Sequence, residues 1–446
     1  MRTDLTTGPV ASSLVIFALP IIAGNLLQQV YTITDTLIVA KFLGPQALAA
    51  VGSAYTLMTF ITSILIGLCM GSGTAFAISY GERNMPKLHE YMGAAFVITL
   101  ITTAVLTATA FLLLDQTLTL LRVPPDIVPL MKTYTAIMYS GIPATFLYNY
   151  FAALLRSAGN SLTPVLFLAA SAVANIILDL WFILQLKLGV GGAAAATVIS
   201  QYLSALLLFW HIYAKQPEFR LKPQAFRLKK QSLTQIIHFS FLTSLQQSVM
   251  NLGILMVQGL VNSFGTTIMA AFAAAVKIDS IAYMPVQDFG NAFSTFIAQN
   301  YGAARRERIR LGIKRAVQLA VSFSLCVSAA VCICAPKLIQ LFVSPEETEI
   351  IAAGAQYLRT EGAFYTGIAI LFLFYGLYRA LEKPFMSVVL TIISLGTRVA
   401  LAYLLAAQES IGVHGIWWSI PIGWALADIT GYVYYRLRRT SLLPGT

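Results

Sequence analysis

The sequence has few charged residues and lacks the polar stretches expected of a water-soluble domain. Of its 446 residues only 11% are charged, whereas 58% are hydrophobic, and the mean hydropathy is +0.76. These values lie outside the usual range of soluble globular proteins. Long apolar runs follow one another almost without pause, so the lipid bilayer is the solvent in which this chain folds. The prediction is an all-α polytopic membrane protein.

Cysteine and histidine are scarce, and neither is arranged as a site. The cysteines lie in apolar runs without metal-ligand spacing or a disulfide framework, which indicates packing roles. The histidines are scattered near the ends of those runs. No nucleophile motif, Gly-rich phosphate loop or metal cluster is present, so we predict neither an enzyme nor a cofactor. The cysteines are Cys69, Cys326, Cys332 and Cys334, and the histidines are His89, His211, His238 and His414.

A net charge of +11 does not indicate a nucleic-acid partner, because the basic residues lie between the apolar segments and not on one face or tail.

The first apolar run is too long for a signal-peptide core and has no cleavage-like end, so we expect it to be a mature helix. Runs of at least about eighteen residues predict twelve spans. They are 14–40, 47–73, 91–114, 127–150, 162–186, 190–213, 233–262, 269–296, 311–335, 351–378, 385–407 and 412–435.

The distribution of lysine and arginine predicts the orientation of these spans. An even number of spans puts both termini on one side, and that side carries 21 of the 29 basic residues, against six on the other. The positive-inside rule then places both termini in the cytoplasm. The most basic connection, inside 211–233, is a cytoplasmic linker at the midpoint of the chain. The predicted division is an amino-terminal lobe (1–213), a linker (214–232) and a carboxy-terminal lobe (233–446).

The two halves repeat each other. An offset of 221 aligns "FLGPQALAAVGSA" (42–54) with "SFGTTIMAAFAAA" (263–275), and "TAFAISYGERN" (74–84) with "TFIAQNYGAAR" (295–305). An offset of 223 aligns "LGVGG" (188–192) with "IGVHG" (411–415). Such constant offsets indicate a duplication. Six spans per copy predict two six-helix bundles related by a pseudo-two-fold axis along the membrane normal, the architecture of an alternating-access transporter.

Polar side chains in two spans predict a functional site. Asn25, Gln28, Thr32 and Asp35 recur at steps of three or four, so they share one face of the first helix and line a cavity. Asn175 and Asp179 are four residues apart in the fifth span, and Thr197 lies in the sixth. At about 1.5 Å per residue, Asp35, Asp179 and Thr197 all lie roughly 9–12 Å deep, so they can meet.

Two carboxylates at one depth suit a group that takes up a proton or a small cation, because low-dielectric surroundings disfavour unpaired charge. Oxygen ligands also suit sodium, and a structural hydrogen-bond pair is the plain alternative. Pro20 interrupts the first helix, since proline removes a backbone hydrogen bond, and we expect either a hinge or a static kink there.

The second half does not repeat this site. The offsets place Met256 opposite Asp35, Arg398 opposite Asn175, and Ala402 opposite Asp179. The eighth span carries its own charges, and we expect internal charge pairs among Lys277, Asp279, Asp288 and Arg398. These pairs are either structural or functional.

Several segments resemble the multidrug and toxic-compound extrusion (MATE) family, and in particular its DinF-like branch. They are "FALPIIAGNLLQQVYTITDTLIVAKFLG", "AISYGERN", "IAQNYGAAR" and "LRSAGNSLTP", and the resemblance covers essentially the whole chain. It implies export of varied, often cationic, amphipathic compounds driven by inward protons or sodium. The amino-lobe cation site of that branch matches Asp35, Asn175, Asp179 and Thr197. The acidic carboxy-lobe site of the other bacterial branch is unmatched, since "SLQQSVMNLGILMVQG" holds no acid.

The resemblance favours a proton-coupled antiporter in the inner cell membrane, acting as a monomer on small-molecule substrates. Sodium coupling stays open. So does a lipid-linked oligosaccharide flippase, which would need a markedly cationic cavity for pyrophosphate. Substrate is expected either to compete with protons for Asp35 or to bind between the lobes on methionine and aromatic surfaces. The further candidate contacts are Tyr31, Tyr139, Met250 and Met256.

Overall fold

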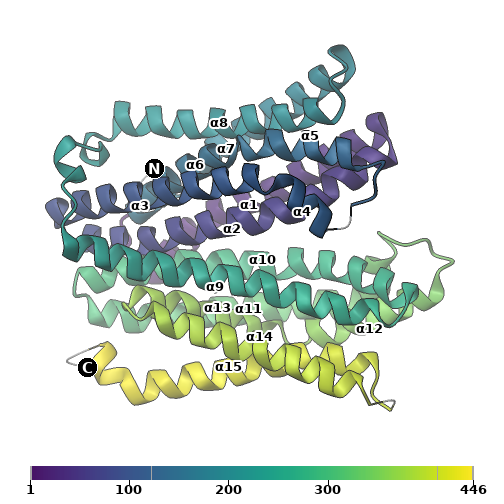
Figure 1. The fold of residues 1–446 in the computed structure, drawn as a ribbon. Coiled ribbons are helices and arrows are strands. Elements are labelled where there is room, and N and C mark those ends of the chain that lie inside the picture. Colours follow the sequence, from purple (N-terminus) through teal and green to yellow (C-terminus); the bar gives the residue numbers. More distant parts are fainter. Residues whose placement is uncertain (1–2, 122, 409, 444–446) are drawn as a thin grey trace. The chain divides into compact units, whose positions relative to one another are not determined.

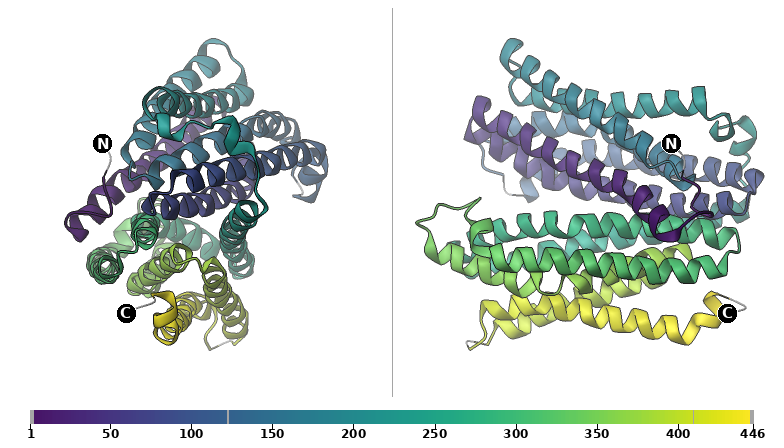
Figure 2. Two further views of the ribbon diagram at one scale, coloured as in Figure 1. Left: turned by 90° about the vertical axis from the view of Figure 1, so that its left-hand side faces the viewer. Right: turned by 180° about the vertical axis from the view of Figure 1, so that it is seen from behind.

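The computed structural model describes residues 3–121, 123–408 and 410–443, and all regular structure in these ranges is helical (Figure 1; two further views in Figure 2). The first half contains α1 (Val10–Leu43), α2 (Pro45–Gly81), α3 (Met85–Leu112), α4 (Leu114–Leu120), α5 (Val128–Tyr139), α6 (Ile142–Ser157), α7 (Leu162–Leu180), η1 (Trp181–Gln185) and α8 (Gly189–Lys215). The linker forms η2 (Pro217–Phe219) and η3 (Pro223–Phe226). The second half contains α9 (Lys230–Asn262), α10 (Thr266–Gly302), α11 (Arg306–Ile339), α12 (Thr348–Gly362), α13 (Tyr365–Ala380), α14 (Pro384–Ala406) and α15 (Val413–Leu442).

These helices follow all twelve predicted spans. Within the described ranges, eight helices are by themselves long and apolar enough to cross a membrane, and α12 with α13 makes a ninth span that bends by 50°. Two predicted spans are therefore broken helices, because 351–378 is split at Ala363–Phe364 and 127–150 is split between α5 and α6. The remaining two, 233–262 and 412–435, coincide with α9 and α15.

The backbone confirms the internal repeat. Helices α2 and α10 each have 37 residues and start 221 residues apart, and each follows a glycine with φ near +90°, Gly44 and Gly265. Left-handed backbone recurs at matched positions in the later turns as well. Gly189 and Gly412 have φ of 59° and 53° and are 223 residues apart, the offset found in the sequence. The two halves therefore share their turns as well as their helices.

The chain divides into two compact units. Unit 1 contains residues 3–4 and 19–244, and unit 2 contains residues 5–18 and the described residues from 245 onward. The opening turns of α1 thus belong to unit 2, and the first half of α9 belongs to unit 1. In unit 2, Arg308 Nε and Asn300 Nδ2 both donate to the Leu5 carbonyl oxygen at 3.0 Å, which fixes the chain ahead of α1.

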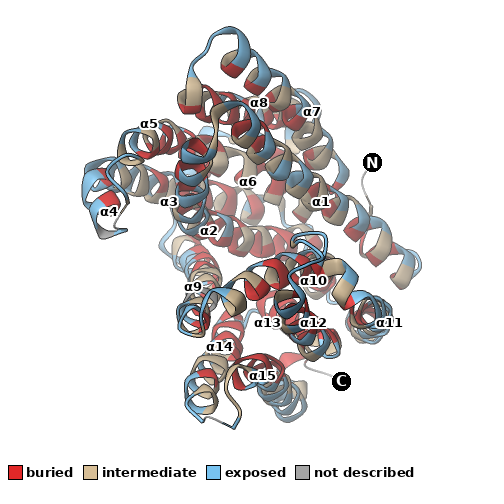
Figure 3. Cartoon of the chain, turned by 90° about the vertical axis from the view of Figure 1, so that its right-hand side faces the viewer, coloured by how far each residue is buried: buried red, intermediate tan, exposed pale blue. Residues whose placement is uncertain are grey.

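Small residues bring α2 close to the first half of α9, and both segments belong to unit 1. A Cβ added to Gly71 would lie 2.4 Å from the Phe239 carbonyl oxygen, and one added to Gly67 would lie 2.4 Å from Ser244 Cα. Ser72 and Ser240 share a buried hydroxyl hydrogen bond of 2.8 Å in the same contact. Close backbone approach through small residues replaces the hydrophobic driving force that is absent in lipid. Figure 3 shows buried residues, coloured red, at intervals along the helices of each unit.

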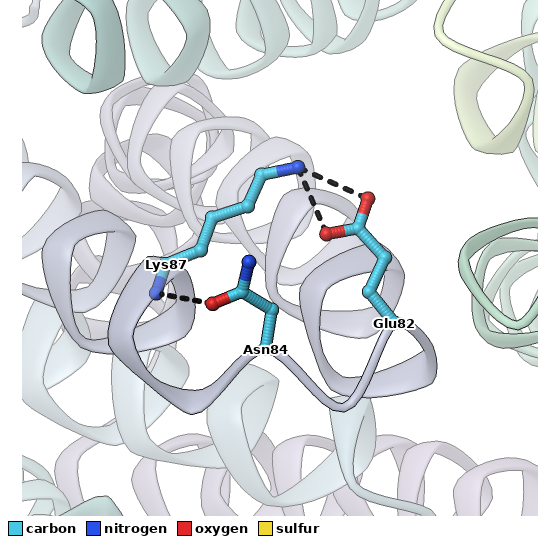
Figure 4. Close-up of polar contacts among 3 residues, drawn as sticks. All are labelled: Glu82, Asn84 and Lys87. Atoms are coloured by element: carbon cyan, nitrogen blue, oxygen red, sulfur yellow. Dashed lines mark hydrogen bonds and ion pairs between the residues drawn. The ribbon is translucent and has the colours of Figure 1, made fainter.

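The turn from α2 to α3 is held by three polar side chains (Figure 4). Asn84 caps α3, because its side chain accepts from the Lys87 backbone N–H at 3.1 Å. The Lys87 ammonium group in turn reaches both carboxylate oxygens of Glu82, at 3.0 and 2.9 Å. The turn is therefore closed and ordered, and it fixes the start of α3.

Candidate functional site

Asp35 is a polar side chain of α1 that its own helix cannot satisfy. The hydroxyls of Thr32, Thr34 and Thr36 each donate to the backbone carbonyl four residues earlier, at 2.8–2.9 Å. A carboxylate has no such option, because it can only accept hydrogen bonds while ionised. Asp35 is 7% exposed and faces the carboxyl group of Asp179, within hydrogen-bonding reach.

Asp179 lies on α7 and is fully buried together with Asn175, one turn earlier. With its amide nitrogen toward the carboxylate, Asn175 donates to Asp179 Oδ2 at 2.9 Å, and its oxygen accepts from the Thr197 N–H of α8 at 3.2 Å. The opposite amide orientation would give a 3.3 Å bond to Thr197 Oγ1 but would turn an oxygen toward the carboxylate. We adopt the first orientation because it pairs donors with acceptors.

Two tyrosines complete this cluster. The hydroxyls of Tyr31 and Thr197 are hydrogen-bonded to each other, and Tyr31 lies beside both carboxyl groups. Tyr134 of α5, 5% exposed, is a neighbour of Asp35, Asp179 and Tyr31. Four helices of unit 1 therefore converge on one point, since α1, α5, α7 and α8 each contribute a polar side chain.

Each carboxyl group of the cluster has one oxygen that could still accept a hydrogen bond or bind a cation. Asp35 Oδ1 and Asp179 Oδ1 are both buried, and neither has a hydrogen-bond partner among the described residues. No lysine, arginine or histidine forms an ion pair with either carboxylate within the described ranges. Two adjacent buried carboxylates without a fixed counter-charge can be neutralised by a proton or by a small cation.

The backbone just after Asp179 is irregular. α7 continues as a π-helical turn, η1, and the Leu186 N–H donates to the Trp181 carbonyl five residues back at 3.1 Å. Widened turns of this kind occur mostly as single turns and frequently at functional sites. The hydrophobic run predicted this span but not the π turn within it.

The other candidates on α1 are less buried. Gln28 is exposed, while Asn25 and Thr32 are half-buried.

The candidate tyrosine of α5, Tyr139, lies outside the cluster. It is 1% exposed and packs edge-on against Phe111, 5.6 Å between ring centroids. Tyr134, five residues earlier, is the α5 tyrosine that the structure brings to the cluster. Sequence reasoning missed Tyr134, because a tyrosine in an apolar span carries no periodic signal of its own.

The two candidate methionines, Met250 and Met256, belong to unit 2 and not to this cluster; Met256 is 46% exposed. Pro20 lies inside the unbroken helix α1, at the point where membership passes from unit 2 to unit 1. Its ring removes the backbone hydrogen bond to Ile16 without ending the helix.

Unit 2 has a different carboxylate pair. Asp279 of α10 and Glu361 of α12 are 3% and 2% exposed and lie within hydrogen-bonding reach of each other. The Tyr365 hydroxyl donates to Asp279 Oδ1, and Tyr357 adds a second hydroxyl beside Glu361. Glu361 was missed at the sequence level, although a single acid in the apolar span 351–378 is a signal that could have found it.

The remaining predicted charges of unit 2 are placed as follows. Arg398 is an electrostatic neighbour of both Asp279 and Glu361. Lys277 is exposed and lies over the Phe342 ring, 5.9 Å from its centroid. Asp288 is buried on α10. The structure therefore brings Arg398 to the acids of this unit, and the pairing of Lys277 with Asp288 stays a prediction.

Comparisons with known proteins identify the family. The MatE family model matches residues 20–181 and 240–404. The probable multidrug resistance protein YpnP of Bacillus subtilis is 30% identical over 439 residues, 98% of this chain and 97% of the relative. The FAD transporter of Shewanella oneidensis is 25% identical over 439 residues, 97% of this chain and 95% of the relative.

Solved structures agree in fold. An outward-facing multidrug resistance MATE family transporter of the MOP superfamily superposes with a TM-score of 0.93 at 24% identity, covering 99% of this chain and 98% of the other. The match includes all twelve predicted spans, and the more specific DinF-like assignment stays a prediction. The chain belongs to the MatE family of multi-pass membrane transporters.

Proposed function

We propose that this protein is a secondary active antiporter that exports amphipathic, often cationic compounds in exchange for inward-moving protons. The observation that carries the proposal is the buried pair Asp35 and Asp179, each with an unpaired oxygen. The name of the Bacillus subtilis relative supports export of drug-like compounds. The FAD transporter indicates that anionic substrates belong in any test panel.

The proposed mechanism uses protonation of this pair. Protons that reach Asp35 and Asp179 from outside neutralise the charge that holds the Asn175 amide in its present contact with Asp179. Loss of that charge changes how α1 packs beside α7 and α8, with Pro20 as the flexible point, and bound substrate leaves. The carboxyl groups then release their protons to the cytoplasm, and the cycle repeats. Asn175 and Thr197 position Asp179 in this scheme.

The proposal includes a location and an orientation. The chain is proposed to lie in the inner cell membrane as a monomer, and the excess of basic residues on one side of the predicted spans supports cytoplasmic termini. Outward export then corresponds to transport away from the side that carries the linker.

The decisive measurement is efflux from proteoliposomes under an imposed pH gradient, compared with an imposed sodium gradient. The panel should contain fluorescent organic cations and a flavin nucleotide. We expect the pH gradient alone to drive transport of the cations. A response to sodium alone would instead assign the Asp35 site to sodium, whose preference for oxygen ligands the cluster also meets.

Asp35→Asn tests the site itself. This variant cannot take up the proton, so gradient-driven export should fall to background while the protein stays folded. Asp126→Asn is the matched control, because Asp126 is exposed in the same unit. Export by Asp35→Asn at the normal rate would refute coupling through Asp35.

A further inference from the structure

The linker between the two halves is folded onto unit 1. Phe219 in η2 and Ala225 in η3 are 1% and 3% exposed. Gly93 of α3 makes this contact possible, because a Cβ there would lie 1.9 Å from the Ala225 carbonyl oxygen. A side chain at position 93 would push this part of the linker away, so the backbone of η3 lies directly against α3.

Polar contacts fix both ends of the same segment. His89 Nε2 lies 2.7 Å from the Glu218 carbonyl oxygen at the start of the linker. At its end, Glu90 accepts from Lys229 Nζ at 2.6 Å and from Ser232 Oγ at 3.0 Å. The linker is therefore held against unit 1 near both of its ends, and we call residues 216–230 the linker platform.

The outer side of this platform is both basic and apolar. Leu228 is 43% exposed, and Phe226 is 42% exposed although its ring also packs edge-on against Phe96 of α3, 6.2 Å between centroids. Residues 216–230 hold five basic residues and one acid, Glu218. Lys229 is paired with Glu90, and the other cations form no ion pair among the described residues. These cations, all exposed, are Arg220, Lys222, Arg227 and Lys230.

Position and chemistry together select the partner. The platform begins one residue after the membrane helix α8 ends at Lys215, so it lies where the helices leave the bilayer. Cations at this level attract anionic headgroups, and exposed aromatic and aliphatic side chains beside them enter the boundary of the acyl chains. A soluble polyanion would contact the charges but leave Phe226 and Leu228 in water.

We propose that residues 220–230 form a docking surface for anionic phospholipid headgroups of the adjoining leaflet. Arg227, Lys222 and Lys230 bind the headgroup phosphates, and Phe226 with Leu228 anchors the surface among the lipid chains. This inference requires only that the chain is embedded in a membrane. It does not depend on which ion drives transport.

Hydrogen exchange of the full chain in nanodiscs tests the proposal. Exchange of residues 216–230 is compared between phosphatidylcholine alone and equal parts of phosphatidylcholine and phosphatidylglycerol. We expect slower exchange with phosphatidylglycerol. The variant Lys222→Gln with Arg227→Gln should lose this protection, and its retained phosphatidylglycerol in native mass spectrometry should fall about 25-fold, about five-fold for each charge removed.

Matched variants make the result specific. Arg436→Gln with Arg438→Gln removes two exposed charges at the end of α15 and should leave the linker response unchanged. Phe226→Ser with Leu228→Ser should weaken retention of phosphatidylglycerol while all charges remain. Equal exchange in the two nanodiscs would overturn the proposal. So would the same protection from inorganic phosphate in phosphatidylcholine nanodiscs, because a lipid would then not be needed.

Discussion

At the scale of single residues, the carboxylates of unit 1 differ from the other polar groups in their helices. The hydroxyl groups of the α1 threonines donate hydrogen bonds to backbone carbonyls of the same helix, so burying them in lipid costs little. Asp35 and Asp179 each retain a buried, unpaired oxygen. A buried group of this kind is destabilising by roughly 1–3 kcal/mol, and more when charged, unless a proton or ion binds it. Such a cost is expected where binding is part of the function.

A substitution at Thr197 tests whether export requires the hydrogen bond between the Thr197 and Tyr31 hydroxyls. Thr197→Val keeps the shape of the side chain but removes the hydroxyl that meets Tyr31. We expect a loss of export of roughly ten-fold, since one positioning hydrogen bond is worth about 1 kcal/mol or more. Thr197→Ser restores the hydroxyl and should recover most of the rate in the same proteoliposome assay. Equal rates for the valine and serine variants would show that the hydroxyl is not needed.

Tyr365 allows a stability test in unit 2. Its hydroxyl donates to the buried Asp279, so Tyr365→Phe leaves that carboxyl group with one partner fewer. We expect destabilisation by about 1–3 kcal/mol, seen as a lower Tm in detergent. Tyr403→Phe is the control, because Tyr403 is 50% exposed. An unchanged Tm for Tyr365→Phe would mean that Asp279 does not need this donor.

The residues of the unit 1 cluster were predictable to different degrees. Asp35, Asn175, Asp179 and Thr197 could be selected because polar groups in apolar spans are rare and their depths could be counted. Tyr134 could not be selected, because its proximity depends on how α5 packs against α1 and α7. A depth count along single helices holds no information on that packing.

At the scale of elements, hydropathy was sufficient for the spans but not for their internal breaks. A run of apolar residues indicates that a segment is long and apolar enough to cross the membrane. It does not report whether the backbone bonds are continuous. The breaks at Ser140–Gly141 and Ala363–Phe364 and the π turn of η1 depend on neighbouring groups that satisfy the freed backbone. These neighbours are set by the tertiary fold.

Glycines in α2 offer a matched pair for the helix contact in unit 1. Gly71→Ala would place its Cβ 2.4 Å from the Phe239 carbonyl oxygen, and a backbone atom cannot move aside cheaply. We expect destabilisation by roughly 1–3 kcal/mol. Gly52→Ala, in the same helix, meets nothing within 4 Å and should be neutral or stabilising by up to about 1 kcal/mol. Thermal unfolding in detergent gives both values, and the close contact of α2 with α9 would be refuted if they were equal.

At the scale of the whole molecule, duplication explains the agreement between sequence and structure. The offsets of 221 and 223 residues found in the sequence recur in the helix starts and in the left-handed turns, such as Gly189 and Gly412. The chemistry of the two halves has nevertheless diverged, because unit 1 pairs Asp35 with Asp179 while unit 2 pairs Asp279 with Glu361. The duplication conserved the backbone and left the buried charges free to change. The division of the chain into the lobes 1–213 and 233–446 stays a prediction.

The proposed orientation can be tested on the whole molecule by cysteine labelling in intact cells. The exposed or half-exposed thiols Cys326, Cys332 and Cys334 are first replaced by serine, and the buried Cys69 is kept. Because the basic residues lie mainly on the side of the linker, Lys215→Cys should react with a membrane-impermeant maleimide only after the cells are permeabilised. Glu346→Cys, in the connection between α11 and α12, should react without permeabilisation. The reverse pattern would place the linker outside the cell and would invert the direction of transport.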